Sequence, residues 1–192
     1  SPDQVMVDLV KEMEGVVSVD PDEEVSLFEQ WGRDRADQDD LPLDNKKYMP
    51  SYTGAGQCLY IIDTGIYDVH NDFNGRATLG GDFINENPKQ DNNGHGTHCA
   101  SIAAGGMYGI APMTPVIKGV KVLSAGGSGT SAGVIKGIQW AVNDAAKMKK
   151  TCVLSLSLGG GKNPALDKAA ADAAKKHIVV VAAGNSNMDA CS

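Results

Sequence analysis

The stretch CLYIIDTG, residues 58–65, is an apolar run that ends in an acidic residue and a glycine. Three later runs are also short, rich in β-branched residues and mostly apolar: residues 116–123, 152–158 and 178–183. Strands that are covered on both faces of a parallel sheet have this composition. Helical patterns lie between these runs, at residues 95–104, 131–149 and 164–176. The alternation predicts an α/β fold, a three-layer sandwich with a mostly parallel sheet.

Candidate functional residues lie at the predicted ends of the strands. Asp63, Gly159 and Asn185 follow strand ends, where open parallel sheets build their sites. His95 begins a predicted helix between two glycines, which permit close approach of another backbone. A buried carboxylate at Asp63 would orient an imidazole and stabilise its protonated form, as a hydrolase requires. An aspartate after a strand also often caps a loop, and a lone histidine is more often structural, so these two residues alone leave the function open.

Composition restricts the class of protein. The chain has 192 residues, 42% of them hydrophobic, which is enough for a sizeable core. Its formal net charge of -7 at pH 7 does not indicate the positively charged surface that binds nucleic acid. No apolar run approaches the roughly 20 residues that cross a bilayer. We therefore expect neither nucleic acid nor a membrane as a partner.

Three segments differ in pattern. Residues 1–30 combine a short amphipathic helical pattern, a strand pattern at residues 16–19 and a turn, which together predict half of a small α+β unit. Residues 31–53 are polar with little periodicity, as expected of a surface linker. Residues 54–192 carry the alternation of strands and helices.

Two glycine-rich segments, residues 123–129 and 155–161, expose backbone N–H and C=O groups that few side chains shield. Such a segment can pair with an extended peptide as an added strand, while pockets below it receive the peptide side chains. Ordinary flexible turns have the same composition. The glycines alone therefore do not decide between a binding edge and a turn.

The chain resembles the subtilisin-like serine proteases in the order and spacing of four motifs. These are residues 61–65 (IIDTG), 94–99 (GHGTHC), 155–160 (SLSLGG) and 182–185 (AAGN). The positions of Cys58 and Cys99 are most similar to the proteinase K branch. The resemblance covers residues 54–192 and implies a subtilisin-like fold.

The resemblance also implies an activity, that of a secreted serine endopeptidase with polypeptide substrates. Asp63 and His95 would be two members of its catalytic triad, and the amide of Asn185 would donate a hydrogen bond to the oxyanion. A further set would line the substrate groove: Gly127, Ser157, Leu158 and Gly159.

The family's inhibitory propeptide is the other partner that the resemblance implies. Residues 1–30 resemble the C-terminal part of that propeptide, and residues 31–35 resemble the start of the mature enzyme. The connection between them is shorter than the family usually has, so self-processing at this point is not assigned.

The nucleophile is the main departure from the family. Subtilisin-like proteases carry it in a Gly-Thr-Ser-Met-Ala segment, and this chain contains none. Residues 129–132 (GTSA) look similar, but they precede Asn185 and take the place of a substrate loop, so Ser131 is not expected to be the nucleophile. We expect an incomplete form that is inactive by itself. The alternative is a non-catalytic, degenerate subtilase that acts as a binding or inhibitory module.

No metal or other cofactor is expected in this chain. His95, His98 and Cys99 suggest zinc, but the helical zinc motif places its histidines four residues apart with a glutamate between them. The turn at residues 104–109 is too short for the loop that holds calcium in subtilisins proper. Calcium is possible in the complete domain.

The four cysteines form no C-x-x-C pair and are compatible with free thiols or with sparse disulfides. Cys58 and Cys152 each begin a predicted strand, and neighbouring strands can bring Cα atoms within the roughly 7 Å that a disulfide requires. These two are candidates for a bridge. Cys99 is expected to be an unpaired thiol behind His95, and Cys191 is expected to lack its partner.

Overall fold

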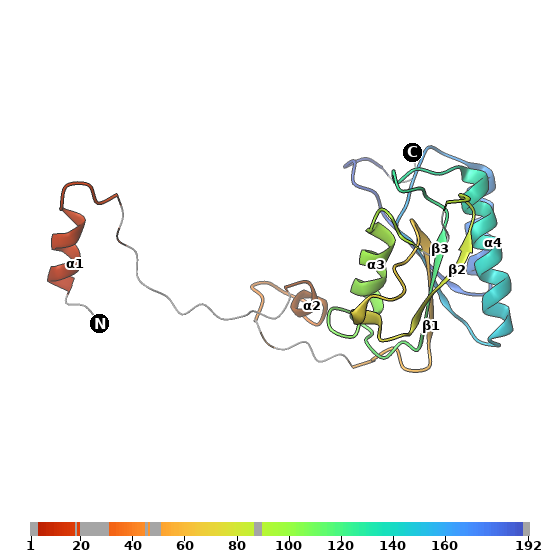
Figure 1. Cartoon of the computed structure of the whole chain (residues 1–192), viewed down its shortest axis with the longest axis horizontal. Helices are drawn as coiled ribbons and strands as arrows, with labels where there is room; N and C mark the ends of the chain where they lie inside the picture. Colours follow the sequence, from red (N-terminus) through yellow and green to blue (C-terminus); the bar gives the residue numbers. More distant parts are fainter. Residues whose placement is uncertain are drawn as a thin grey trace.

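The computed structural model describes residues 4–17, 19, 31–44, 46, 51–86 and 90–189. Within these residues, five strands form one sheet in the order β2-β3-β1-β4-β5, and every neighbouring pair is parallel (Figure 1). The strands are β1 (Cys58–Asp63), β2 (Ala77–Asp82), β3 (Val116–Lys121), β4 (Val153–Leu156) and β5 (Ile178–Val181). The predicted parallel α/β sheet is confirmed.

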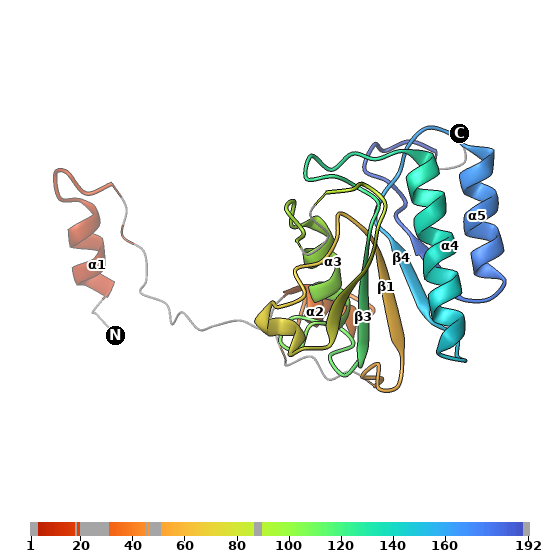
Figure 2. The same ribbon diagram turned by 45° about the vertical axis from the view of Figure 1, so that its right-hand side comes forward.

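The structure also describes five α-helices and one 3-10 turn within these residues. They are α1 (Gln4–Lys11), α2 (Trp31–Ala36), the 3-10 turn η1 (Asn71–Phe73), α3 (His95–Ala104), α4 (Ser131–Lys147) and α5 (Pro164–Ala174). Helix α3 covers one face, and α4 and α5 lie side by side over the other (Figure 2). The molecule therefore has the predicted three layers.

Strand β1 holds the layers together because it is buried at all six positions. Tyr60 and Ile62 pack into the cluster below α4 and α5. Leu59 and Ile61 point the other way, into the cluster that includes Ala100 of α3. Alternate side chains of a strand face opposite sides of the sheet, so one apolar run supplies both cores.

Strand β2 is absent from the predicted elements, and its two glycines explain why. Glycine is depleted in strands, so the sequence of β2 does not indicate one. A Cβ atom at Gly80 would lie 2.3 Å from the Trp140 ring, and one at Gly81 would lie 3.2 Å from it. The glycines therefore make room for the indole of α4, a tertiary requirement that is invisible in the local sequence.

The segments before residue 54 match the predictions only in part. Helix α1 forms as predicted, and none of its residues is buried. Residues 16, 17 and 19 form no strand, so that part of the prediction is wrong, and residues 20–30 lie outside the described residues. Helix α2 lies where the sequence predicts a linker. The guanidinium of Arg33 donates to the carbonyl oxygen of Met107, which anchors this short helix to the turn after α3.

Strand β5 is the last strand on its side of the sheet, with Ile178, Val180 and Val181 each more than half exposed. The sequence predicts an apolar strand here, and an edge of this kind is open to pairing with further backbone.

None of the described helices is both long and apolar enough to cross a membrane.

Cys58 and Cys152 form a disulfide between the starts of β1 and β4, with their Cα atoms 4.9 Å apart. Cys99 is a free thiol, and both predictions are confirmed. Cys191 lies outside the described residues. The disulfide ties two adjacent strands that are far apart in the sequence.

Replacing Cys58 and Cys152 together by alanine should destabilise the protein. The bridge spans 94 residues, and opening so long a loop in the unfolded chain should lower the free energy of unfolding by about 4 kcal/mol. Urea unfolding measures this change. Peptide mass spectrometry of the unreduced protein should find the Cys58–Cys152 cross-link, and a cross-link through Cys99 would contradict the structure.

Candidate active site

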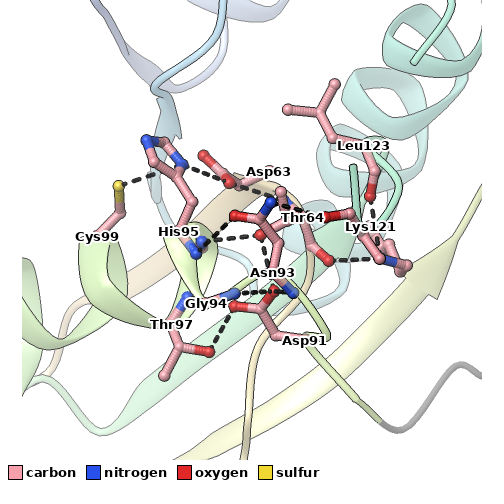
Figure 3. A network of polar contacts seen from close by, with 12 residues as sticks. Asp63, Thr64, Asp91, Asn93, Gly94, His95, Thr97, Cys99, Lys121 and Leu123 are labelled. Atoms are coloured by element: carbon pink, nitrogen blue, oxygen red, sulfur yellow. Dashed lines mark hydrogen bonds and ion pairs between the residues drawn. The ribbon is translucent and has the colours of Figure 1, made fainter. Parts of the chain in front are cut away.

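Asp63 and His95 meet at the carboxyl end of β1. Nδ1 of His95 lies 2.7 Å from Oδ1 of Asp63 (Figure 3). The carboxylate is completely buried, whereas the imidazole is 48% exposed. An acidic group in the core thus contacts a ring that reaches the surface. The structure brings these two predicted residues together.

Glycines allow the contact to form. Gly65 turns the chain sharply after β1, with φ of 116°. A Cβ atom at Gly96 would lie 2.2 Å from the carbonyl oxygen of Gly65 and 3.2 Å from Cβ of Asp63. Only glycine lets the first turn of α3 approach the end of β1 this closely. The first residue of that turn is His95.

The two oxygens of Asp63 have different surroundings. Oδ1 accepts a second hydrogen bond, from the backbone N–H of Thr64 at 2.7 Å. Oδ2 is buried and has no hydrogen-bond partner among the described residues. The negative charge is therefore held through Oδ1, the oxygen that faces the imidazole.

This arrangement fixes the tautomer of His95. An ionised carboxylate only accepts hydrogen bonds, so Nδ1 carries the proton that is donated to Asp63. The other ring nitrogen, Nε2, is then an unprotonated acceptor. Within the described part of the chain, no hydroxyl group forms a hydrogen bond with Nε2. The pair can thus take up a proton at Nε2, and Asp63 would stabilise the resulting imidazolium.

Asp91 is a residue of the site that the sequence reasoning missed. One carboxylate oxygen accepts from the hydroxyl of Thr64 at 2.8 Å and from the N–H of Gly94 at 2.9 Å. The other accepts from the N–H of Thr97 at 2.9 Å and from its hydroxyl at 2.7 Å. A short acidic side chain just before a helix is a capping signal, which could have identified it.

These hydrogen bonds perturb the acidity of Asp91. Burial raises the pKa of its carboxyl, but donors from Thr97, Gly94 and Thr64 outweigh burial and hold the pKa below the usual value. Asp91 is therefore ionised and locks the start of α3 to the residue that follows Asp63.

Cys99 lies one helical turn beyond His95, with Sγ 3.9 Å from Nδ1. Burial raises the pKa of this thiol, the Ser157 hydroxyl opposes that shift, and the charges of Asp63 and Asp91 raise the pKa further. The thiol is therefore protonated, and the adjacent Nδ1 is already bonded to Asp63. Cys99 is poorly placed to act as the nucleophile of a Cys-His pair.

One group of potential metal ligands occurs among the described residues: Asp63, His95 and Cys99, whose ligand atoms lie within 4.8 Å of one another. The zinc set suggested by the sequence differs, because it contained His98, which lies outside this group. A metal here would compete with the hydrogen bond between Asp63 and His95, and we assign none.

The remaining predicted site residues follow other strands. Asn185 follows β5 and is exposed. Gly127 lies in an exposed turn closed by its own N–H donating to the carbonyl of Ser124 at 2.9 Å. Ser157 and Leu158 are half-buried after β4, and Gly159 is exposed with open space around its Cα. The hydroxyl of Ser157 acts on the thiol of Cys99, which lies beside His95.

Ser131 is the first residue of α4, and the side chain of the preceding Thr130 caps that helix. Thr130 Oγ1 accepts from the N–H of Gly133 at 3.1 Å. The residues that resemble a nucleophile segment thus form an ordinary helix start.

Comparison with known proteins places this geometry in a family. The sequence pattern of the subtilase family matches residues 54–191. The chain belongs to the subtilase family. A solved structure described as a cold-adapted subtilisin-like serine proteinase has a TM-score of 0.77 and 45% identity, over 84% of this chain and 58% of that one. The fold of this subtilase is therefore subtilisin-like.

Two curated relatives extend over nearly the whole chain. Alkaline serine exoprotease A of Vibrio alginolyticus is 41% identical over 99% of this chain and 34% of its own length. The extracellular serine proteinase of Thermus sp. (strain Rt41A) is 42% identical over 99% of this chain and 47% of its own. The chain thus spans between a third and half of these relatives.

Replacing Asp91 by asparagine should reduce stability in a pH-dependent way. The folded state lowers the pKa of this carboxyl, so ionised Asp91 stabilises the fold above the unfolded-state pKa of about 3.9. That stabilisation is lost as the pH falls through the lower, folded-state pKa. In urea unfolding, Asp91→Asn should be less stable than wild type at pH 7, and the gap should narrow below about pH 4. The exposed Asp40→Asn variant is the control, and an unchanged gap at all pH values would contradict the assignment.

Proposed function

We propose that the protein to which this subtilase chain belongs is a secreted serine endopeptidase with polypeptide substrates. The single observation that carries this proposal is the 2.7 Å hydrogen bond between half-exposed His95 and buried Asp63. Family membership supports it, because relatives over nearly the whole chain are named serine proteases, one of them extracellular.

The mechanism assigns one role to each predicted catalytic residue. His95 takes the proton of a serine hydroxyl at Nε2 as that oxygen attacks a peptide carbonyl. Asp63 stabilises the imidazolium through the bond at Nδ1. The side-chain amide of Asn185 donates to the developing oxyanion. These assignments are predictions, supported by the tautomer that Asp63 imposes on His95.

The nucleophile is proposed to come from a segment other than those described. Ser131 is the first residue of α4, a helix that is capped by Thr130 in the ordinary way. It therefore has no feature of an activated serine. Residues 1–192 by themselves are then inactive. Gly127, Ser157, Leu158 and Gly159 are proposed to line the groove in which the peptide pairs with exposed backbone. The propeptide role of residues 1–30 and calcium binding by the complete domain stay predictions.

Removing either member of the pair should nearly abolish peptidase activity in the full protein. His95→Ala deletes the proton acceptor, and Asp63→Ala deletes the group that holds it in the correct tautomer. Both should lower kcat by at least about a thousandfold, as expected for groups that act as a unit. Hydrolysis of a chromogenic peptide measures this, with His98→Ala as the control on the same helix. A full protein that cleaved peptides at the wild-type rate after His95→Ala would disprove the mechanism.

The isolated 192-residue chain should not react with a fluorophosphonate probe, because no serine in the described part of the chain forms a hydrogen bond with Nε2 of His95. The full protein should be labelled once, on a serine outside these residues. Intact-mass spectrometry of both samples distinguishes the outcomes. Labelling of the isolated chain, at Ser131 or elsewhere, would refute the assignment, and a full protein that is never labelled would favour a non-catalytic subtilase.

A further inference from the structure

Lys121 is a charged residue inside the core that neither the proposed mechanism nor the motifs explain. Its side chain is completely buried at the end of β3. In the parallel pairing of β1 with β3, its register partner is Asp63. Two opposite charges are therefore buried at the ends of adjacent strands.

The ammonium group of Lys121 has three hydrogens, and three acceptors receive them. It donates to the carbonyl of Thr64 at 2.7 Å and to the carbonyl of Leu123 at 3.0 Å (Figure 3). The third acceptor is the carboxylate of Glu86, at 3.2 Å. These acceptors follow β1, β3 and β2 respectively, so one cation joins the ends of three strands.

Thr64 connects the ammonium of Lys121 to the candidate catalytic pair. Its N–H donates to Oδ1 of Asp63, the oxygen that contacts His95. Its hydroxyl accepts from the N–H of Gly96 at 2.9 Å and donates to Asp91. A displacement of Thr64 would therefore move both the carboxylate and the helix start that carries the imidazole.

Glu86 connects the same ammonium to the segment proposed to bind substrate. Its carboxylate accepts from the N–H of Ala125 at 3.1 Å. The carbonyl of Ala125 accepts from the side-chain amide of Asn93 at 2.8 Å, and the Asn93 oxygen accepts from the N–H of His95 at 3.2 Å. These contacts form a second chain of interactions from Lys121, through Glu86, Ala125 and Asn93, to the backbone of His95.

We propose that Lys121, with Glu86, is a positioning residue that sets the alignment of Asp63 with His95 and couples it to the segment around Ala125. The inference rests on the proposed function for its kinetic consequence, but the alignment itself is a property of the described residues. A buried ammonium used only to fill space would be replaceable by an apolar side chain of similar volume at little cost in stability. Here its three acceptors belong to the segments that hold the pair and the groove.

The test is Lys121→Met in the full protein, with Lys118→Met as the matched control. Lys118 lies on the same strand and is ion-paired with Asp144, away from the candidate site. Two readouts are used: kcat and KM for a peptide substrate, and the low-field proton signal of the His95 Nδ1–H group in an NMR spectrum. Glu86→Gln is the second variant, since it removes the charge but keeps an oxygen for Ala125.

Lys121→Met should lower kcat by about tenfold to a hundredfold, as expected when reacting groups are misaligned by about 1 Å, with a smaller change in KM. The His95 proton signal should shift or broaden. Glu86→Gln should have a smaller effect of the same kind, because the two carbonyls still hold the ammonium. Lys118→Met should leave the signal and kcat unchanged, although its melting temperature falls.

A folded Lys121→Met protein with the wild-type kcat and His95 signal would overturn the proposal. If that variant does not fold, a wild-type signal and kcat in Glu86→Gln would overturn it instead. A wild-type protein without peptidase activity would refute the proposed function, while a changed His95 signal in the variants would still support the positioning role.

Discussion

The parallel pairing of β1 with β3 on one side and β4 on the other determines where the functional side chains lie. Burial at every position fixes where β1 lies between the two helical layers. Its last residue lies at the edge of the sheet where the neighbouring parallel strands also end. Asp63 is therefore held by the core itself. The turn that follows can then place Thr64 and Gly65 against the start of α3, which carries His95.

Rigidity at the site comes from hydrogen bonds that cross between segments. Asp91 joins the start of α3 to Thr64, and Lys121 joins Thr64 to the ends of two further strands. Three of these four contacts have a backbone group as one partner, so each of the three ties a buried or half-buried side chain to a fixed point of the chain. The imidazole of His95 is held by this hydrogen-bond network but is itself half-exposed. That exposure suits the proton exchange with a bound molecule that we propose for it.

Much of this could be predicted from the sequence, for identifiable reasons. Apolar runs and helical periodicity depend on local burial, so β1, β3, β4 and β5 and their helices were predicted to within a few residues. The sequence does not indicate strand β2, because its glycines are required by the close approach of Trp140, which is distant in the sequence. Lys121 was missed for a similar reason: a lysine at the end of an apolar run reads as a surface residue, and only the sheet register reveals its burial beside Asp63.

The cost of the buried charges bears on the choice between an enzyme and a degenerate subtilase. Asp63 and Lys121 are both removed from water, which is unfavourable unless each is well paired. Asp63 is paired through one oxygen only, and its buried Oδ2 has no partner among the described residues. A module that only binds a partner would gain from apolar residues here. A protein that protonates His95 needs a buried negative charge beside Nδ1, because the imidazolium then becomes its counter-ion. The hydrogen bond from His95 to the buried carboxylate of Asp63 is the arrangement that the proposed proton transfer at His95 requires.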